Sequence, residues 1–480
     1  MLIDKNTVID GKKLWEIKPG PVKELKPLCR KMAAEGSVLL ENDGVLPFSK
    51  NEKIAVFGRT QETYIKSGTG SGGLVRVEKA PCIMESFREN GVFKTDEELA
   101  AEYTAWIEKN PYDNGHGWAT EPWSQKEMPL SDDLVKSASA RNDAAVIIIG
   151  RTAGEDKDNS YTKGSFCLSD EEDDMIKKVT ENFKKTVVVL NVGNLIDLSF
   201  TDKYSISALL YIWQGGEEGA NALADILSGK TSPCGKLPDT QVLKAEDYPY
   251  FDAFGNKNEC IYEEDIYVGY RYFETFAKDK VRYPFGFGLT YTEFETEYSA
   301  YEKDGNITVS AAVKNIGNYT SREVIQVYFG APCGKLGKPE KQLIAYKKTK
   351  ELKPQESETL DITFSVKDMS SYDDGGVTGN EFCYVLEKGD YYIYAGNNVR
   401  QSGFVFTYNV KETVITERLE QVLPPEKEFK RYTAVQDENG KVTLAQTDVP
   451  LRKFDLDIRI NERRPQDLPF TGDKGIKLID

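Results

Sequence analysis

The stretch that decides the fold of this chain is Ala144-Ala145-Val146-Ile147-Ile148-Ile149-Gly150, an unbroken apolar run. A run without polar alternation is typical of a strand that is buried on both faces of a parallel sheet. Similar apolar runs occur at 54–58, 186–190 and 208–213, with amphipathic stretches between them. This alternation predicts an α/β domain with a mostly parallel sheet.

Two of the intervening stretches carry helix signals. Residues 169–179 begin with a serine and three acidic residues, a capping arrangement that complements the helix dipole. Residues 219–227 gather small and branched apolar side chains on one face. We expect both stretches to form crossover helices that cover the sheet.

The pattern changes after residue 291. Short runs at 307–313, 324–329, 359–364 and 391–395 are rich in β-branched or aromatic residues and are separated by turn sequences. They predict a small antiparallel β-sandwich. Beyond residue 407 the chain is charged, poorly periodic and marked by prolines, which is typical of an extended connector rather than a third core.

A chain of 480 residues is longer than a single hydrophobic core usually supports. We therefore expect an N-terminal arm at 1–24, an α/β domain at 25–291, a β-sandwich at 292–408 and an extended connector at 409–480. No internal repeat is evident.

The composition excludes several classes of protein and site. With 62 basic and 78 acidic residues, the net charge of −16 argues against a nucleic-acid partner or an anionic membrane partner. Seven scattered cysteines without a Cys-x-x-Cys pair suggest neither a disulfide framework nor a zinc site. Because neither a signal-peptide core nor a membrane-length apolar run occurs, we expect a cytoplasmic protein, and a homo-oligomer stays open.

Glu155 follows the deciding run within a few residues, in Arg151-Thr152-Ala153-Gly154-Glu155-Asp156. The carboxyl ends of strands in an open α/β sheet are where ligands bind, so this carboxylate is a candidate general acid/base. The single histidine, His116, rules out a multi-histidine metal site and leaves little scope for a Ser-His-Asp triad.

Five segments occur in a fixed order over roughly 260 residues, more than the typical size of one domain. They are 34–47, which includes Glu41-Asn42-Asp43-Gly44; 58–73, which includes Gly68-Thr69-Gly70-Ser71-Gly72; Gly154-Glu155; Trp213-Gln214-Gly215-Gly216-Glu217 followed by 232–238; and Tyr267-Val268-Gly269-Tyr270 with 283–291. Together they resemble the retaining β-glucosidases of glycoside hydrolase family 3. The resemblance implies an (α/β)6 sandwich followed by a fibronectin type III-like domain.

The resemblance also implies a role for Glu155. In that family the acid/base protonates the glycosidic oxygen and then activates the water that releases the sugar from the nucleophile. The family segment usually reads Gly-Glu-Gly-x-Asp-Arg, whereas here Asp156 replaces a glycine and Asn159 stands where arginine is common. A carboxylate at position 156 would raise the pKa of Glu155 if it pointed inward.

Two further residues are candidate substrate ligands. Ser71, in a loop that resembles one reaching towards the sugar cleft, would donate a hydrogen bond to a substrate hydroxyl; the alternative is a plain glycine turn. The loop also lacks the Gly-Lys-Ser/Thr ending of a phosphate-binding loop. Trp118 offers a flat ring for stacking on a sugar, or it anchors its long loop to the core together with Trp123.

The nucleophile of the resembled family is an aspartate in a Ser-Asp-Trp-like segment of a (β/α)8-type barrel, and no such segment occurs here. Circularly permuted members of the family place the barrel after the other two domains. The resemblance therefore implies that the barrel that completes this chain is a separate polypeptide, a cleaved part or a part left out of this sequence. We expect the acid/base-bearing part of a retaining exo-β-glucosidase that acts on terminal non-reducing β-D-glucosyl residues of β-glucosides or oligosaccharides, without a cofactor. The alternatives are a β-xylosidase or α-arabinofuranosidase, and a non-catalytic carbohydrate-binding or scaffold module.

Overall fold

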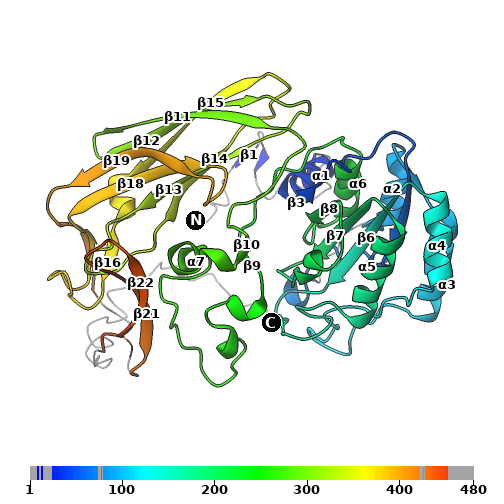
Figure 1. Cartoon of the computed structure of the whole chain (residues 1–480), viewed down its shortest axis with the longest axis horizontal. Coiled ribbons are helices and arrows are strands. Elements are labelled where there is room, and N and C mark those ends of the chain that lie inside the picture. The colour runs from blue at the N-terminus through cyan, green and yellow to red at the C-terminus, as the bar shows by residue number, and fades with distance from the viewer. Residues whose placement is uncertain are drawn as a thin grey trace.

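The computed structural model describes residues 24–73, 77, 79–420, 425 and 427–451, together with the backbone of two short paired strands, β1 (Val8–Ile9) and β2 (Lys12–Lys13). Most of the predicted N-terminal arm and residues 452–480 of the predicted connector lie outside the described residues. An α/β domain and a β-sandwich lie side by side, with the short helix α7 (Tyr270–Phe276) between them (Figure 1).

The α/β domain is built on a six-stranded sheet in the order β3-β8-β7-β6-β4-β5. Its strands are β3 (Val38–Asn42), β4 (Lys53–Phe57), β5 (Lys94–Thr95), β6 (Ala144–Arg151), β7 (Thr186–Val192) and β8 (Ala208–Tyr211). All neighbouring strands are parallel except β3, which runs antiparallel to β8 at one edge. The predicted mostly parallel sheet is confirmed.

Helices cover both faces of this sheet. They are α1 (Leu25–Gly36), α2 (Ile83–Asn90), α3 (Glu97–Lys109), α4 (Asp132–Arg141), α5 (Asp170–Asn182) and α6 (Gly219–Leu227). In β6, Ala145, Ile147 and Ile149 belong to the same apolar cluster as the buried faces of α4 and α5. The alternate residues of the strand belong to the cluster of α2 and α6. This explains why the run of β6 is apolar without alternation: both faces are buried.

The β-sandwich consists of two antiparallel sheets that pack around one core. One sheet contains β11 (Phe294–Lys303), β12 (Asn306–Asn315) and β15 (Ser357–Ser365); the other contains β14 (Gln342–Lys348), β13 (Val324–Gly330), β18 (Gly389–Gly396) and β19 (Gly403–Val410). A smaller sheet of β16 (Ser371–Asp373), β17 (Cys383–Leu386) and β20 (Val414–Arg418) lies at one end. The predicted fold class, an α/β domain followed by an all-β sandwich, is confirmed.

The charged segment after the sandwich contains a β-hairpin that the sequence pattern did not reveal. Its strands are β21 (Lys430–Gln436) and β22 (Val442–Asp448). The backbone of β21 is fixed to the segment before α7, because the Tyr432 N–H donates to Glu263 O at 2.7 Å and the Ala434 N–H to the Tyr267 hydroxyl at 2.8 Å. The hairpin also contacts the sandwich, since Arg431 Nη1 lies 2.6 Å from Asp374 Oδ2, and it lies below the sandwich on the far side of α7 from the α/β domain (Figure 1).

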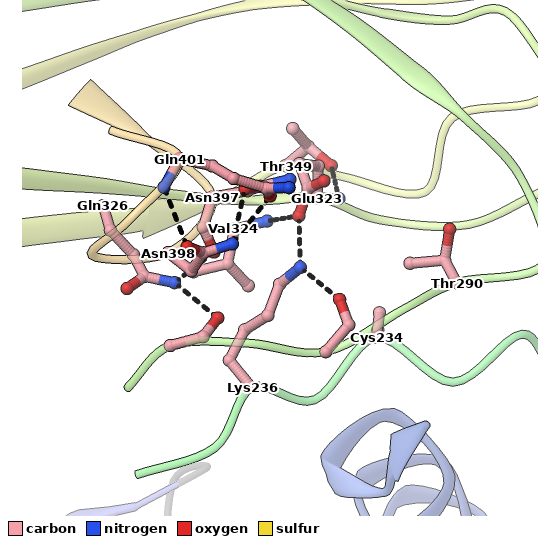
Figure 2. A network of polar contacts seen from close by, with 12 residues as sticks. Cys234, Lys236, Thr290, Glu323, Val324, Gln326, Thr349, Asn397, Asn398 and Gln401 are labelled. Atoms are coloured by element: carbon pink, nitrogen blue, oxygen red, sulfur yellow. Dashed lines mark hydrogen bonds and ion pairs between the residues drawn. The ribbon is translucent and has the colours of Figure 1, made fainter. Parts of the chain in front are cut away.

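Buried polar contacts join the two domains. Lys236 Nζ lies 2.9 Å from Glu323 Oε1, and Gln326 Nε2 donates to the carbonyl of Gly286 at 3.1 Å (Figure 2). The linking segment also returns to the sheet, because the Leu289 N–H donates to Leu39 O at 2.8 Å and forms an antiparallel bridge with β3. A shorter pair of strands, β9 (Gln241–Val242) and β10 (Val281–Tyr283), lies next to this linker.

Among the described residues, none of the helices combines the length and the apolar character that a membrane crossing requires.

Candidate functional site

The candidate site forms where β4 and β6 end. These two strands are parallel neighbours, so the loops that follow them leave the same edge of the sheet. The loop after β4 contains the glycine-rich segment, and the loop after β6 contains Glu155. Residues separated by more than 80 positions in the sequence thus become neighbours in the fold.

The two loops approach each other closely through their backbones. The Thr69 N–H donates to Ala153 O at 2.8 Å, and Thr69 and Gly154 form an isolated parallel bridge. A Cβ atom on Gly154 would lie 2.4 Å from Thr69 N, and one on Gly68 would lie 2.8 Å from Ala153 O. Glycine is required at both positions because a side chain would push the loops apart.

Glu155 is held by Ser71 across this contact. Its Oε2 accepts hydrogen bonds from Ser71 Oγ at 2.7 Å and from the Ser71 N–H at 3.0 Å. The Ser71 hydroxyl, and then the Ser71 N–H, lowers the pKa of Glu155 below its ordinary value, because both donors favour the charged carboxylate. Glu155 is fully exposed, so water still screens its charge.

Asp156 adopts a left-handed backbone conformation with φ of 57°. Glycine adopts this conformation freely and aspartate tolerates it, which accounts for an aspartate at a position where the resembled family has glycine. Its side chain points to the neighbouring loop, where Oδ2 accepts a hydrogen bond from Trp118 Nε1 at 3.0 Å. This contact between residues 118 and 156 was not foreseen from the sequence.

The loop that contains Trp118 forms the third wall of the site. The Thr152 N–H donates to Trp123 O at 2.7 Å, and Trp123 Nε1 donates to Asp158 O at 2.9 Å. Trp123 thus anchors the loop, as one of the alternatives expected. Trp118 is held at its edge by Asp156 and remains 54% exposed in the described part of the chain, which leaves a ring face open to solvent.

A cavity of about 660 Å³ lies between the glycine-rich loop and the Trp118 loop. Its walls include Thr69, Gly70, Trp118, Glu121 and Thr152. The Thr152 hydroxyl and Glu121 Oε2 are buried and have no hydrogen-bond partner among the described residues. Buried polar atoms without partners are costly, so both side chains would gain by turning towards a polar ligand in this cavity.

His116 is exposed in the same loop, and its backbone N–H donates to Thr120 Oγ1 at 2.8 Å. Glu121 and Thr152 could not be singled out from the sequence, because an isolated glutamate and an isolated threonine match no motif. Only the way in which the loops surround the cavity distinguishes these two residues.

Comparison with known proteins gives the family. The profile of the "Glycosyl hydrolase family 3 C-terminal domain" matches residues 37–291, and that of the "Fibronectin type III-like domain" matches residues 323–399. A "Beta-glucosidase" of Ruminococcus albus is 48% identical over 447 residues, which are 93% of this chain and 47% of that protein.

Two solved structures resemble the chain. A beta-glucosidase from Paenibacillus barengoltzii superposes with a TM-score of 0.91 at 44% identity, over 95% of this chain and 51% of that one. Beta-glucosidase 3B from Thermotoga neapolitana, in complex with glucose, superposes with a TM-score of 0.74 at 35% identity, over 84% of this chain and 55% of that one. The chain spans about half the length of these proteins.

Proposed function

Because this chain belongs to glycosyl hydrolase family 3, we propose that it bears the acid/base carboxylate of a retaining exo-β-glucosidase, and that Glu155 is that carboxylate. The observation that carries the proposal is the position of Glu155 after β6, where it is exposed, lies against Gly70 in the cavity wall and is tied to the glycine-rich loop by Ser71. The substrate class is the β-glucosides, by likeness to relatives that carry the name beta-glucosidase.

The two halves of the reaction make opposite demands on Glu155. The acid must hold a proton to give to the glycosidic oxygen, and the conjugate base must then remove a proton from water. The two hydrogen bonds from Ser71 favour the charged form and suit the second half. A bound sugar that excludes water from Glu155 would raise its pKa and supply the protonated form for the first half.

We assign leaving-group binding to the cavity beside Glu155. The Trp118 ring, fixed at its edge by Asp156, would stack on the C–H face of a sugar or an aryl group. The side chains of Thr152 and Glu121, which line this cavity, would bind hydroxyls of the same group after turning towards it. The sequence predicts that Ser71 donates a hydrogen bond to a substrate hydroxyl. Since its hydroxyl donates to Glu155 in this structure, Ser71 stays a candidate ligand of the glucosyl unit that would accept a hydrogen bond instead.

The nucleophile has to come from outside this sequence. A retaining glycosidase places its two carboxyl groups about 5–5.5 Å apart. No Ser-Asp-Trp-like segment occurs in the 480 residues. We propose that a (β/α)8-type barrel, in the same or another polypeptide, carries the aspartate and binds over the open side of Glu155, and that this chain by itself does not hydrolyse glucosides.

The experiment that tests the proposal is the substitution Glu155→Gln in the active assembly that contains this chain. With cellobiose, whose leaving group needs a proton, we expect kcat to fall by about 10²–10⁴-fold, the usual contribution of a general acid/base. With 2,4-dinitrophenyl β-glucoside the first step needs no proton, and added azide, which needs no general base, should speed the second step and release glucosyl azide. Glu171→Gln, the same change at an exposed glutamate of α5, serves as the control.

An unchanged kcat for cellobiose would refute the role of Glu155. Saturable glucoside binding by this chain alone, without hydrolysis in any assembly, would favour a carbohydrate-binding module instead. A panel of nitrophenyl glucosides, xylosides and arabinofuranosides would decide the sugar.

A further inference from the structure

Arg151 is the last residue of β6 and one of the largest fully buried side chains of the molecule, with 1% of its surface exposed. Its guanidinium forms two hydrogen bonds with Glu172, from Nη1 to Oε1 at 2.5 Å and from Nη2 to Oε2 at 2.7 Å. A buried arginine at the end of an apolar strand is expensive unless it is paired, and here the pairing is bidentate.

Of the remaining donors of Arg151, Nη1 also binds Gly150 O in β6 at 2.8 Å, and the other two bind the far end of the loop that carries Glu155. Nε donates to Ser165 O at 2.8 Å, and Nη2 donates to Cys167 O at 3.2 Å. The loop leaves the sheet directly after Arg151 and returns past residues 165 and 167 to α5. One side chain therefore holds both the departure and the return of the loop.

Glu172 extends this anchor into the next helix. Its Oε2 accepts a hydrogen bond from the Ser169 N–H at 2.8 Å, while Ser169 Oγ accepts one from the Glu172 N–H at 3.2 Å. This capping box fixes the first turn of α5. The start of the helix and the end of the strand are thus joined through a single buried carboxylate.

The middle of the loop is held by its neighbours instead, because the Thr69 N–H donates to Ala153 O, Trp118 Nε1 to Asp156 Oδ2 and Trp123 Nε1 to Asp158 O. Asn159 bonds Leu195 O and the side chain of Asn194, both in the loop after β7, at 2.9 and 2.6 Å. Glu155 itself is exposed, and Ser71 is the residue that its carboxylate binds among those the structure describes. The two ends of the loop, which Arg151 holds, and the neighbours of its middle together set where the Glu155 carboxylate stands relative to the sheet.

We propose that Arg151, paired with Glu172, is a positioning residue that sets where the Glu155 carboxylate stands. The proposal rests on the acid/base role proposed above. Arginine is required, because its planar fork directs donors from three nitrogens to three carbonyls and a carboxylate at once. Lysine would keep the charge but present all its donors from one atom.

The test is Arg151→Lys in the active assembly, assayed with cellobiose and with 2,4-dinitrophenyl β-glucoside. We expect kcat for cellobiose to fall by about 10²-fold, the cost of displacing a catalytic group by about 1 Å. The first step with the dinitrophenyl substrate should change by less than about twofold, since it needs no proton from Glu155. A loss of folded protein would lower both rates equally, so the difference between the substrates separates positioning from stability.

Arg141→Lys is the matched control. Arg141 also pairs with a buried carboxylate, that of Asp96 at 2.9 Å, but the pair lies at α4, away from the loop. The Arg141→Lys variant should leave the ratio of the rates with cellobiose and with the dinitrophenyl substrate unchanged. Equal losses with both substrates for Arg151→Lys, or no loss, would overturn the inference.

The two proposals fail in different ways. If Glu155→Gln spares cellobiose hydrolysis, the acid/base role and the positioning role both fall. If Glu155→Gln shows the leaving-group dependence and Arg151→Lys does not, only the positioning role falls.

Hydrogen exchange of this chain alone gives a readout without activity. Amides of residues 152–168 should exchange faster in Arg151→Lys while those of β7 keep their protection. Unchanged exchange in the loop would also overturn the inference.

Discussion

Arg151–Glu172 and Lys236–Glu323 are both buried ion pairs, but they hold different parts of the molecule. The side chains of the first pair are 2% and 6% exposed and lie within the α/β domain. Those of the second are 9% and 8% exposed and join the α/β domain to the sandwich (Figure 2). The two pairs therefore stabilise different things: a loop geometry in one case and a domain arrangement in the other.

The hydrogen bonds around the two ion pairs also differ, since those of the first hold a loop and those of the second hold the linker between the domains. Arg151 binds carbonyls of the loop that follows its own strand. Lys236 binds Gly288 O at 2.8 Å, in the linker between the domains, and Glu323 accepts a hydrogen bond from the Val324 N–H at 2.8 Å. We expect a broken Arg151 pair to damage both stability and catalysis, and a broken Lys236 pair to damage stability alone.

The largest effect is expected for Glu172→Ala. It leaves the Arg151 guanidinium buried without its carboxylate, which costs about 3–5 kcal/mol of unfolding free energy. Urea unfolding of the α/β domain measures the loss, and the kcat ratio between cellobiose and the dinitrophenyl substrate measures the effect on the loop. A loss below about 1 kcal/mol would mean that water or a shifted side chain replaces the carboxylate.

A third buried carboxylate sharpens the comparison, because its oxygens bind peptide N–H groups. Glu127 accepts hydrogen bonds from the N–H groups of Arg59 and Met128, and burial raises its pKa to about 7. Between pH 4.5 and 7 the native state holds a proton that the unfolded state has released, so stability falls as the pH rises. Relative to Glu127→Gln, the wild type should lose about 3 kcal/mol of unfolding free energy over this window, because each pH unit between the two pKa values contributes about 1.4 kcal/mol.

Urea unfolding at four pH values across and just beyond this window tests the expectation. A difference between the two proteins that stays constant with pH would show that Glu127 is ionised in the native state across the range.

Lys236→Ala should have a smaller effect, about 1.5–3 kcal/mol, the range for losing a hydrogen bond to a charged group. The interdomain pair is slightly more exposed, so water can partly compensate Glu323. The double variant Lys236→Met with Glu323→Leu should recover most of the loss, because an apolar pair carries no desolvation penalty. Fluorescence-monitored urea unfolding checks both, and a leaving-group-dependent loss of activity would break the comparison with Arg151.

Ser71→Ala is expected to leave the free energy of unfolding almost unchanged and to change the pKa of Glu155. Without the Ser71 hydroxyl, the charged form of Glu155 loses its strongest hydrogen bond, so its pKa rises. Carboxyl-carbon NMR of this chain, with Glu155→Gln to assign the signal, measures the direction. An unchanged pKa of Glu155 would indicate that the N–H of residue 71 is sufficient to stabilise the charged carboxylate.

The sequence predicted the strands whose residues are all buried and the helix that begins at a clear capping residue. β6 and β7 are recognisable because every residue in them is buried, and α5 begins at the predicted serine cap. β3 was not assigned as a strand, since Glu41 interrupts a short run at a sheet edge. The hairpin of β21 and β22 was missed because Ala434 is the one fully buried residue of its two strands, so the strands show little alternation of apolar and polar residues.

The candidate site likewise has one part that the sequence predicts and another that it does not. Glu155 could be predicted from its place after β6, because a strand end is a local property of the sequence. The bonds from Ser71 to Glu155 and from Trp118 to Asp156 join residues 84 and 38 positions apart. They depend on β4 and β6 being neighbours and on the path of a long loop, which no spacing in the sequence encodes.

The bridge between Leu39 and Leu289 has a consequence for self-association. β3 is the outermost strand of the six-stranded sheet, and an open outer strand offers free N–H and C=O groups to another molecule. The linker towards the sandwich occupies part of that outer rim. A fragment that ended before residue 285 would lose this cover, and we expect it to aggregate through strand addition even though every helix of the α/β domain were present.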